Sequence, residues 1–215
     1  MDILPLGHAA FKLRGKTVTV VTDPYDSAKV GLKFPKNVEA DVVTISHEHP
    51  DHNHVASVSG TPFVIRGPGE YEIKGAGVIG VSTFHDAEGG NVRGKNTAYR
   101  IELDGVRFAH LGDLGHELTS QQVDILDGVD VLFVPVGGFF TIDAKVAAGV
   151  VAAIDPKIVI PMHYAANQSS AMLKEKLSPV SLFLKEMGKE GVVPVPKLSV
   201  TKDKLPAEMQ IVVLE

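Results

Sequence analysis

The feature that most constrains this sequence is a run of metal-binding residue types directly after a short apolar segment. Residues 41–46 combine apolar and β-branched side chains and predict a buried strand, which His47-Glu48-His49-Pro50-Asp51-His52 follows. Loops at strand ends are where open functional sites tend to be built. Metal ions such as zinc bind imidazole nitrogen and carboxylate oxygen. We therefore expect a metal site that begins here, rather than a solvated polar loop.

The chain contains nine histidines and no cysteine. Disulfides and thiolate metal sites are therefore excluded, and a transition-metal site must use histidine and carboxylate. Three later segments offer such residues just after an apolar run, at His85, Asp113 and His163. Ligand-type residues at the ends of successive strands predict one shared site at one edge of stacked sheets.

The order of predicted elements indicates sheets covered by helices. The first half contains mainly short β-rich runs, with a two-residue hairpin signal at Asp104-Gly105. The second half alternates strands with helices. Apolar residues make up 44% of the 215 residues, which suits one domain with a sizeable core. The sequence thus predicts an α+β fold.

Several boundaries carry local signals. Thr119 with Gln122 forms a possible capping box before a helix. Residues 143–154 read as a helix, and Ser178-Pro179 supplies the N-cap and first-turn proline of another. Residues 210–214 read as a closing strand.

The pocket walls are expected from the loops 25–37, 86–96 and 165–176, the first of them irregular. The segment Gly137-Gly138-Phe139-Phe140 either adds apolar lining near the site or joins the core, and the core is slightly favoured.

The motifs together resemble the metallo-β-lactamase superfamily over nearly the whole chain. The resemblance rests on His-x-His-x-Asp-His at 47–52, a later histidine, Gly112-Asp113, and His163 after an apolar strand. Further motifs are similar to one branch, the ascorbate-6-phosphate lactonase-like and phospholipase-D-like hydrolases, and most of all to its short uncharacterised members. These motifs are Gly7-His8-Ala9-Ala10-Phe11, Thr22-Asp23-Pro24, Val134-Pro135-Val136-Gly137-Gly138 and Pro161-Met162-His163-Tyr164.

The resemblance implies a four-layer αββα sandwich, with metals at one edge of its sheets. It implies a single domain over residues 1–215, made of two half-units of roughly 1–110 and 111–215. Two divalent metal ions are implied, Zn²⁺ first, with Mn²⁺ or Fe²⁺ as alternatives. The implied ligands are His47, His49 and His85 for the first ion, Asp51, His52 and His163 for the second, and Asp113 bridging both. His110 competes with His85, whose position in the order of motifs favours it.

The remaining polar candidates each have two interpretations. His8 either contacts substrate or donates a proton, or it makes a structural hydrogen bond. His110 is expected either as a hydrogen-bond partner of a ligand or as a packed residue, and Asp23 either orients a metal-bound histidine or shapes a turn. His116 either lines the mouth of the site or lies on an exposed loop.

The implied chemistry is hydrolysis by a hydroxide that two metal ions activate, with Asp51 orienting the water and accepting its proton. The expected substrate is a small molecule with an ester, lactone or phosphodiester bond, and a compact phosphorylated or lactone-like metabolite is the first candidate. One alternative is a di-iron redox protein on the same fold, although relatives with that chemistry carry glutamate where this chain has His49. Another is a non-catalytic metal-binding protein.

Charge and hydropathy limit the partners. The net charge is −5 without a basic stripe, so no nucleic-acid partner is expected. No stretch approaches the roughly 20 apolar residues of a membrane span. The first residues lack the pattern of a signal peptide, so a cytoplasmic location is expected. Homo-oligomerisation stays open.

Overall fold

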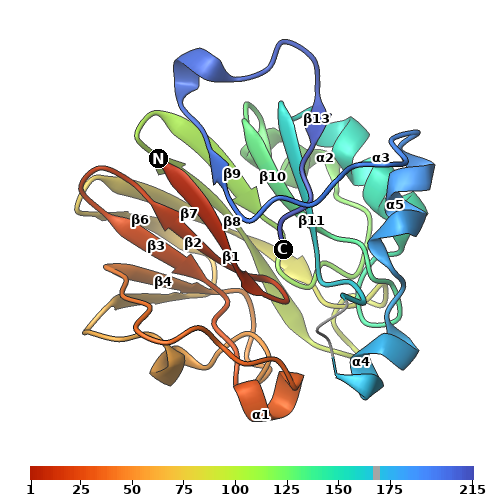
Figure 1. Ribbon diagram of the computed structural model, residues 1–215, viewed down its shortest axis with the longest axis horizontal. Coiled ribbons are helices and arrows are strands. Elements are labelled where there is room, and N and C mark those ends of the chain that lie inside the picture. The colour runs from red at the N-terminus through yellow and green to blue at the C-terminus, as the bar shows by residue number, and fades with distance from the viewer. Residues whose placement is uncertain (167–169) are drawn as a thin grey trace.

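The computed structural model describes residues 1–166 and 170–215, which form two β-sheets packed face to face with helices outside them (Figure 1). The strands of the first sheet are, in spatial order, β12 (Leu198–Ser199), β1 (Asp2–Gly7), β2 (Ala10–Arg14), β3 (Thr19–Thr22), β4 (Val42–Ile45) and β5 (Phe63–Arg66). Those of the second sheet are β13 (Gln210–Ile211), β11 (Ile158–Met162), β10 (Val131–Pro135), β9 (Val106–His110), β8 (Lys95–Leu103), β7 (Ala76–Phe84) and β6 (Gly69–Ile73).

Alternation of side chains along the strands divides the apolar residues between layers, because successive strand residues point to opposite faces. In β10, Val131 and Phe133 join the core between the sheets, whereas Leu132 and Val134 join the core beneath the outer helices. Strands buried on both faces explain why the apolar runs of the sequence are continuous rather than alternating.

The outer layers are built differently on the two sheets. The helices α2 (Ser120–Leu126), α3 (Ala144–Ile154) and α5 (Val180–Glu186) cover the second sheet. The first sheet is covered by residues 25–40, which include α1 (Ser27–Val30), and by α4 (Ala171–Lys176) from the second half of the chain. Short 3₁₀ helices at Val55–Ser57 and Lys202–Lys204 complete the described elements. The predicted four-layer αββα sandwich is confirmed, and the half-unit boundary near residue 110 stays a prediction.

Some local predictions are confirmed and others are wrong. Thr119 forms a complete capping box with Gln122, and Asp104-Gly105 turns with both φ angles positive. Ser178 does not cap α5, because Pro179 takes the N-cap position without a side-chain bond. The last strand ends at Ile211, and Leu214 forms only an isolated bridge with Val195. The loop prediction 25–37 missed α1, and that for 165–176 missed α4, with 167–169 outside the described residues.

Among residues 1–166 and 170–215, no helix combines the length and apolar character needed to cross a lipid bilayer.

Tyr99 joins the two sheets beside the segment His47–His52. Its buried hydroxyl donates to Ile45 O at 2.7 Å and accepts from Gly67 N at 3.0 Å. We expect Tyr99→Phe to lower the free energy of unfolding by about 1–3 kcal/mol, because backbone groups lose a partner. Urea denaturation measures the change.

The matched control is Tyr71→Phe, since the Tyr71 hydroxyl makes only an exposed bond to Pro68 O at 3.4 Å. We expect this variant to stay within about 0.5 kcal/mol of the wild type. Equal losses in both variants would contradict a special role for Tyr99.

Candidate metal centre

The candidate ligands come from strand ends that meet at one edge of the sandwich. The run 47–52 follows β4, and Asp23 follows β3, the parallel neighbour of β4. In the second sheet His163 follows β11 and Asp113 follows β9, both of which run parallel to β10. His85 directly follows β7. Segments far apart in the sequence therefore meet at this edge.

The described residues contain three groups whose candidate ligand atoms all lie within 4.8 Å of one another. The groups are His47 with His49 and His85, then Asp51 with His52, His163 and His8, and finally His47 with His52 and Asp113. The structure thus brings together all the residues expected as ligands. It adds His8, and His110 belongs to none of these groups.

Asp113 lies between the two sets of histidines and is almost completely buried. Its carboxylate oxygens lie 3.2 Å from His52 Nε2, 3.2 Å from His163 Nε2, 3.4 Å from His85 Nε2 and 3.8 Å from His47 Nε2. A single carboxylate with this reach suits a bridging position. The backbone N–H of Asp113 donates to Asn96 Oδ1 at 3.0 Å, which fixes the residue in place.

Asp23 orients His52 directly and orients His47 through Ser46. Its Oδ2 lies 2.9 Å from His52 Nδ1 and accepts from Ser46 Oγ at 2.5 Å. Ser46 Oγ in turn lies 2.9 Å from His47 Nδ1. When each Nδ1 donates, the Nε2 atoms of His47 and His52 keep free lone pairs that face the cluster. Carboxylates commonly hold metal-binding histidines in this way.

Several buried polar atoms of the cluster have no hydrogen-bond partner in the described ranges. They are His47 Nε2, His52 Nε2, His85 Nδ1, Asp113 Oδ1 and both ring nitrogens of His163. Leaving a buried polar group unsatisfied costs roughly 1–3 kcal/mol. This many unsatisfied polar atoms in one place therefore need an explanation. A divalent ion fits, because imidazole and carboxylate are its usual protein donors.

The charges of the cluster also require a compensating positive charge. Burial would raise the pKa of Asp113, yet His163 and His52 hold that pKa well below its usual value. The pKa of Asp51 is likewise lowered by His52 and His8, against the effect of burial. The buried residues of the described ranges include no lysine or arginine. Positive charge must therefore come from protonated histidine or from a bound cation.

The histidines at the edge of the cluster are held neutral. Burial lowers the pKa of His47 to about 3 and the pKa of His85 to about 4. Burial also lowers the pKa of His8 to about 4. A neutral imidazole has a lone pair to offer a metal ion, so these rings are ready to bind one near neutral pH.

His110 and His116 bind the backbone instead. His110 Nε2 lies 2.8 Å from Ala9 O, and its Nδ1 accepts from Gly112 N at 3.2 Å. Both of its nitrogens are therefore engaged, although Nδ1 also lies 4.0 Å from Asp23 Oδ2. His116 Nε2 accepts from Phe84 N at 3.1 Å, and its Nδ1 lies 2.6 Å from Glu117 O. This ring fastens its loop to the end of β7.

Sequence reasoning missed the roles of Ser46 and Asn96, and it named Gly112 only as part of the Gly112-Asp113 motif, without its role in packing. Ser46 stands directly before the motif, so its position was a usable signal, whereas nothing near Asn96 pointed to a role. Gly112 has φ +56°, and a Cβ there would lie 2.4 Å from Asn96 Oδ1 and 2.5 Å from Ser46 Cβ. Only glycine allows the two sheets to approach this closely beside Asp113.

The cluster opens into a cavity of about 530 Å³. Its lining includes the ligand candidates His49, Asp51, His85 and Asp113, the cations Lys29 and Arg93, and the apolar residues Val30, Val92, Phe140 and Leu173. The core placement favoured for this segment is wrong for Phe139, which is 61% exposed, whereas Phe140 packs against the core over the first sheet and also lines this cavity.

A loop of defined shape carries Arg93 to the mouth of the cavity. The Asp86 carboxylate accepts hydrogen bonds from the backbone N–H groups of Glu88, Gly90, Val92 and Arg93. These bonds lower the pKa of Asp86 to about 2. The Arg93 guanidinium lies 5.3 Å from the ring centre of Phe140.

Comparison with known proteins agrees with this geometry. The family model for the beta-lactamase superfamily domain matches residues 2–163. This protein belongs to the β-lactamase superfamily. A UPF0173 metal-dependent hydrolase from Thermococcus onnurineus is 31% identical over 185 residues, which cover 74% of this chain and 82% of that protein. The ascorbate-6-phosphate lactonase-like branch stays a prediction.

Solved structures of other proteins share the fold. A candidate Zn-dependent hydrolase from Thermotoga maritima is 40% identical, with a TM-score of 0.81 and coverage of 99% of this chain and 97% of that chain. CmlA, a diiron β-hydroxylase from Streptomyces venezuelae, is 14% identical with a TM-score of 0.58, over 93% of this chain and 54% of that chain. The likeness to CmlA shows the fold alone.

We expect Asp23→Asn to weaken Zn²⁺ binding by about 10–100-fold while the fold is retained, because His47 and His52 lose the carboxylate that orients them. Titration of metal-free protein against a competing chelator measures the affinity. The control is Asp26→Asn, since Asp26 only caps α1 through Ala28 N and should leave the affinity unchanged. Equal affinities in wild type and Asp23→Asn would show that Asp23 does not hold the ligands.

Proposed function

We propose that this protein is a hydrolase that uses two divalent metal ions to cleave an ester, lactone or phosphodiester bond in a small anionic molecule. One observation carries the proposal: buried imidazole nitrogens and an oxygen of Asp113 converge from both sheets, and these atoms have no hydrogen-bond partner among the residues that the structure describes. An arrangement with that many unsatisfied polar atoms is costly unless a cation occupies it.

The proposed ligand sets follow the groups in the structure. His47, His49 and His85 would hold the first ion, and Asp51, His52 and His163 the second. Asp113, which approaches histidines of both sets, would bridge the two ions. Nitrogen and oxygen donors without sulfur suit Zn²⁺, which we propose first, and also Mn²⁺ or Fe²⁺.

When bound, such ions supply Lewis acidity, which lowers the pKa of a coordinated water from ~15.7 to about 7 and polarises a substrate oxygen. The residues of the chain supply the rest. Asp51 lines the cavity with its side chain 33% exposed, so it can orient a water and accept its proton. Asp23 and Ser46 keep His47 and His52 in place during turnover.

The cavity favours a small anionic substrate. Its volume lies within the roughly 300–1,000 Å³ of typical ligand pockets. Lys29 and Arg93 lie at its walls, and neither side chain pairs with a carboxylate in the described ranges. Phosphate or carboxylate on the substrate would complement these cations. Val92, Phe140 and Leu173 would contact its apolar part.

The di-iron redox alternative is less well supported. The second histidine of the motif is His49, and its ring lies 4.6 Å from the ring of His47 and 5.1 Å from that of His85, which fits an imidazole ligand. A site with this histidine argues against the di-iron redox alternative. A cytoplasmic location and self-association stay predictions.

We expect purified protein to contain about two divalent ions per chain and to lose hydrolysis when a chelator removes them. Asp51→Ala should lower kcat by at least about 10²-fold, because a general base contributes 10²–10⁴-fold and Asp51 is also a proposed ligand. Elemental analysis, circular dichroism and a panel of chromogenic esters, lactones and phosphodiesters, each with and without a phosphate group, provide the measurements.

Asp124→Ala is the control, because Asp124 is an exposed carboxylate on α2. Hydrolysis that survives metal removal would refute the proposal. Tight binding of metal with no turnover of any panel member would favour the non-catalytic alternative.

A further inference from the structure

His8 reaches the cluster from a part of the chain that the proposed ligand sets do not use. It lies in the turn between β1 and β2, and its side chain is only 2% exposed. Its Nε2 atom is buried and has no hydrogen-bond partner within the described ranges. It lies 3.4 Å from Asp51 Oδ2, and its ring centre lies 4.1 Å from that of His163.

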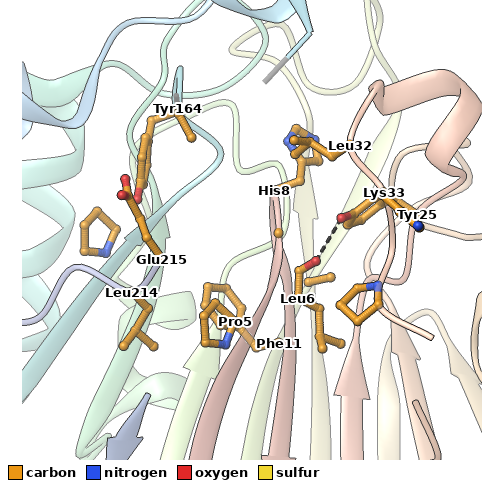
Figure 2. A pocket seen from close by; sticks show the side chains of 15 residues that line it. Pro5, Leu6, His8, Phe11, Tyr25, Leu32, Lys33, Tyr164, Leu214 and Glu215 are labelled. Atoms are coloured by element: carbon orange, nitrogen blue, oxygen red, sulfur yellow. Dashed lines mark hydrogen bonds between the residues drawn. The ribbon is translucent and has the colours of Figure 1, made fainter. Parts of the chain in front are cut away.

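The backbone holds His8 in a conformation that a non-glycine residue rarely adopts. His8 has φ +56°, in the left-handed region, after Gly7 at φ +107°. The turn is fixed by a hydrogen bond from Tyr25 Oη to Leu6 O at 2.8 Å, which Figure 2 shows beside His8. A backbone bond from His163 N to His8 O, at 3.4 Å, ties the turn to the other sheet. Such strain persists where surrounding structure enforces it, and it concentrates at functional sites.

The distances around His8 match those between two ligands of one ion. With bonds of about 2.0–2.1 Å, two neighbouring ligands of one ion lie about 2.9–3.6 Å apart, depending on the angle between the bonds. The separations of Asp51 Oδ2 from His8 Nε2 and from His52 Nε2 are 3.4 and 3.7 Å. A direct N–H···O hydrogen bond would bring the atoms to about 2.7–3.2 Å. His8 is therefore spaced like a ligand rather than like an outer partner of Asp51.

We propose that His8 Nε2 is a further protein ligand of the second ion, next to Asp51, His52, His163 and the shared Asp113. This inference rests on the proposed two-metal function. It makes the two positions unequal, since the first then has three imidazoles and the second has three imidazoles and a carboxylate, apart from the shared Asp113. Catalytic metal sites keep an open position, so the water and the substrate oxygen would bind on the side of the first ion.

The inference is tested by titrating metal-free, full-length protein with Co²⁺ and following bound equivalents by equilibrium dialysis and coordination by visible absorption. His8→Ala should weaken the second equivalent by more than about 100-fold, beyond the 10–100-fold typical of losing an outer partner. The visible spectrum of that equivalent should change, and the first should keep its affinity. His8→Gln, which retains much of the ring's bulk, is measured in parallel and should show the same spectral change.

Two other variants provide reference values for the loss of metal affinity. Asp23→Asn reports the loss of an outer partner, and His54→Ala removes a histidine whose Nδ1 lies 2.8 Å from Ser57 Oγ, away from the cluster. Wild-type affinity and spectrum in both His8 variants would overturn the inference, and so would a loss no larger than that of Asp23→Asn with an unchanged spectrum. If the His8 variants overturn the inference but the wild type binds two ions and hydrolyses substrate, the proposed function stands. A wild type that binds fewer than two ions overturns both.

Discussion

The edge of the sandwich buries more negative charge than its own side chains can neutralise without a proton or a cation. Asp23, Asp51 and Asp113 lie within one cluster, and Asp23 and Asp113 are almost wholly enclosed. Removing a carboxylate from water costs several kcal/mol unless an opposite charge compensates for it. The described core offers no lysine or arginine, only histidines. The carboxylates raise the pKa of His52 well above its usual value, against the effect of burial, so without metal a proton takes part of the cation's place. Folding, protonation and metal binding are therefore coupled at this edge.

The sandwich holds the side chains of the cluster rigidly from several directions. Parallel strands in both sheets deliver their carboxyl ends to the same edge. Gly112 lets Asp113 approach Ser46 across the interface, and Tyr99 ties β8 to the end of β4. The walls of the cavity lie around this frame, where the Asp86 loop contributes Arg93 and α4 contributes Leu173. Such peripheral segments can differ between members of one superfamily while the sandwich stays the same.

The sequence predicted the site better than its surroundings, for physical reasons. Imidazoles and aspartates after apolar runs have few structural uses, so His47–His52, Asp113 and His163 pointed to the cluster, and the order of motifs chose His85 over His110. Predictions failed where tertiary contacts decide. Phe139 is as apolar as a core residue, yet its side chain is 61% exposed. The helix α4 forms over the first sheet although its sequence neighbours cover the second. Asn96 carries no local signal, because its role exists only once Asp113 folds against it.

The most direct test of a cluster built around cations is anomalous diffraction from crystals of the protein grown with Zn²⁺, measured on both sides of the zinc absorption edge. Two anomalous peaks are predicted, one among His47, His49 and His85 and one among Asp51, His52 and His163, with Asp113 between them. Occupied zinc sites found only on the surface, with Asp113 paired to protonated histidine instead, would contradict the account.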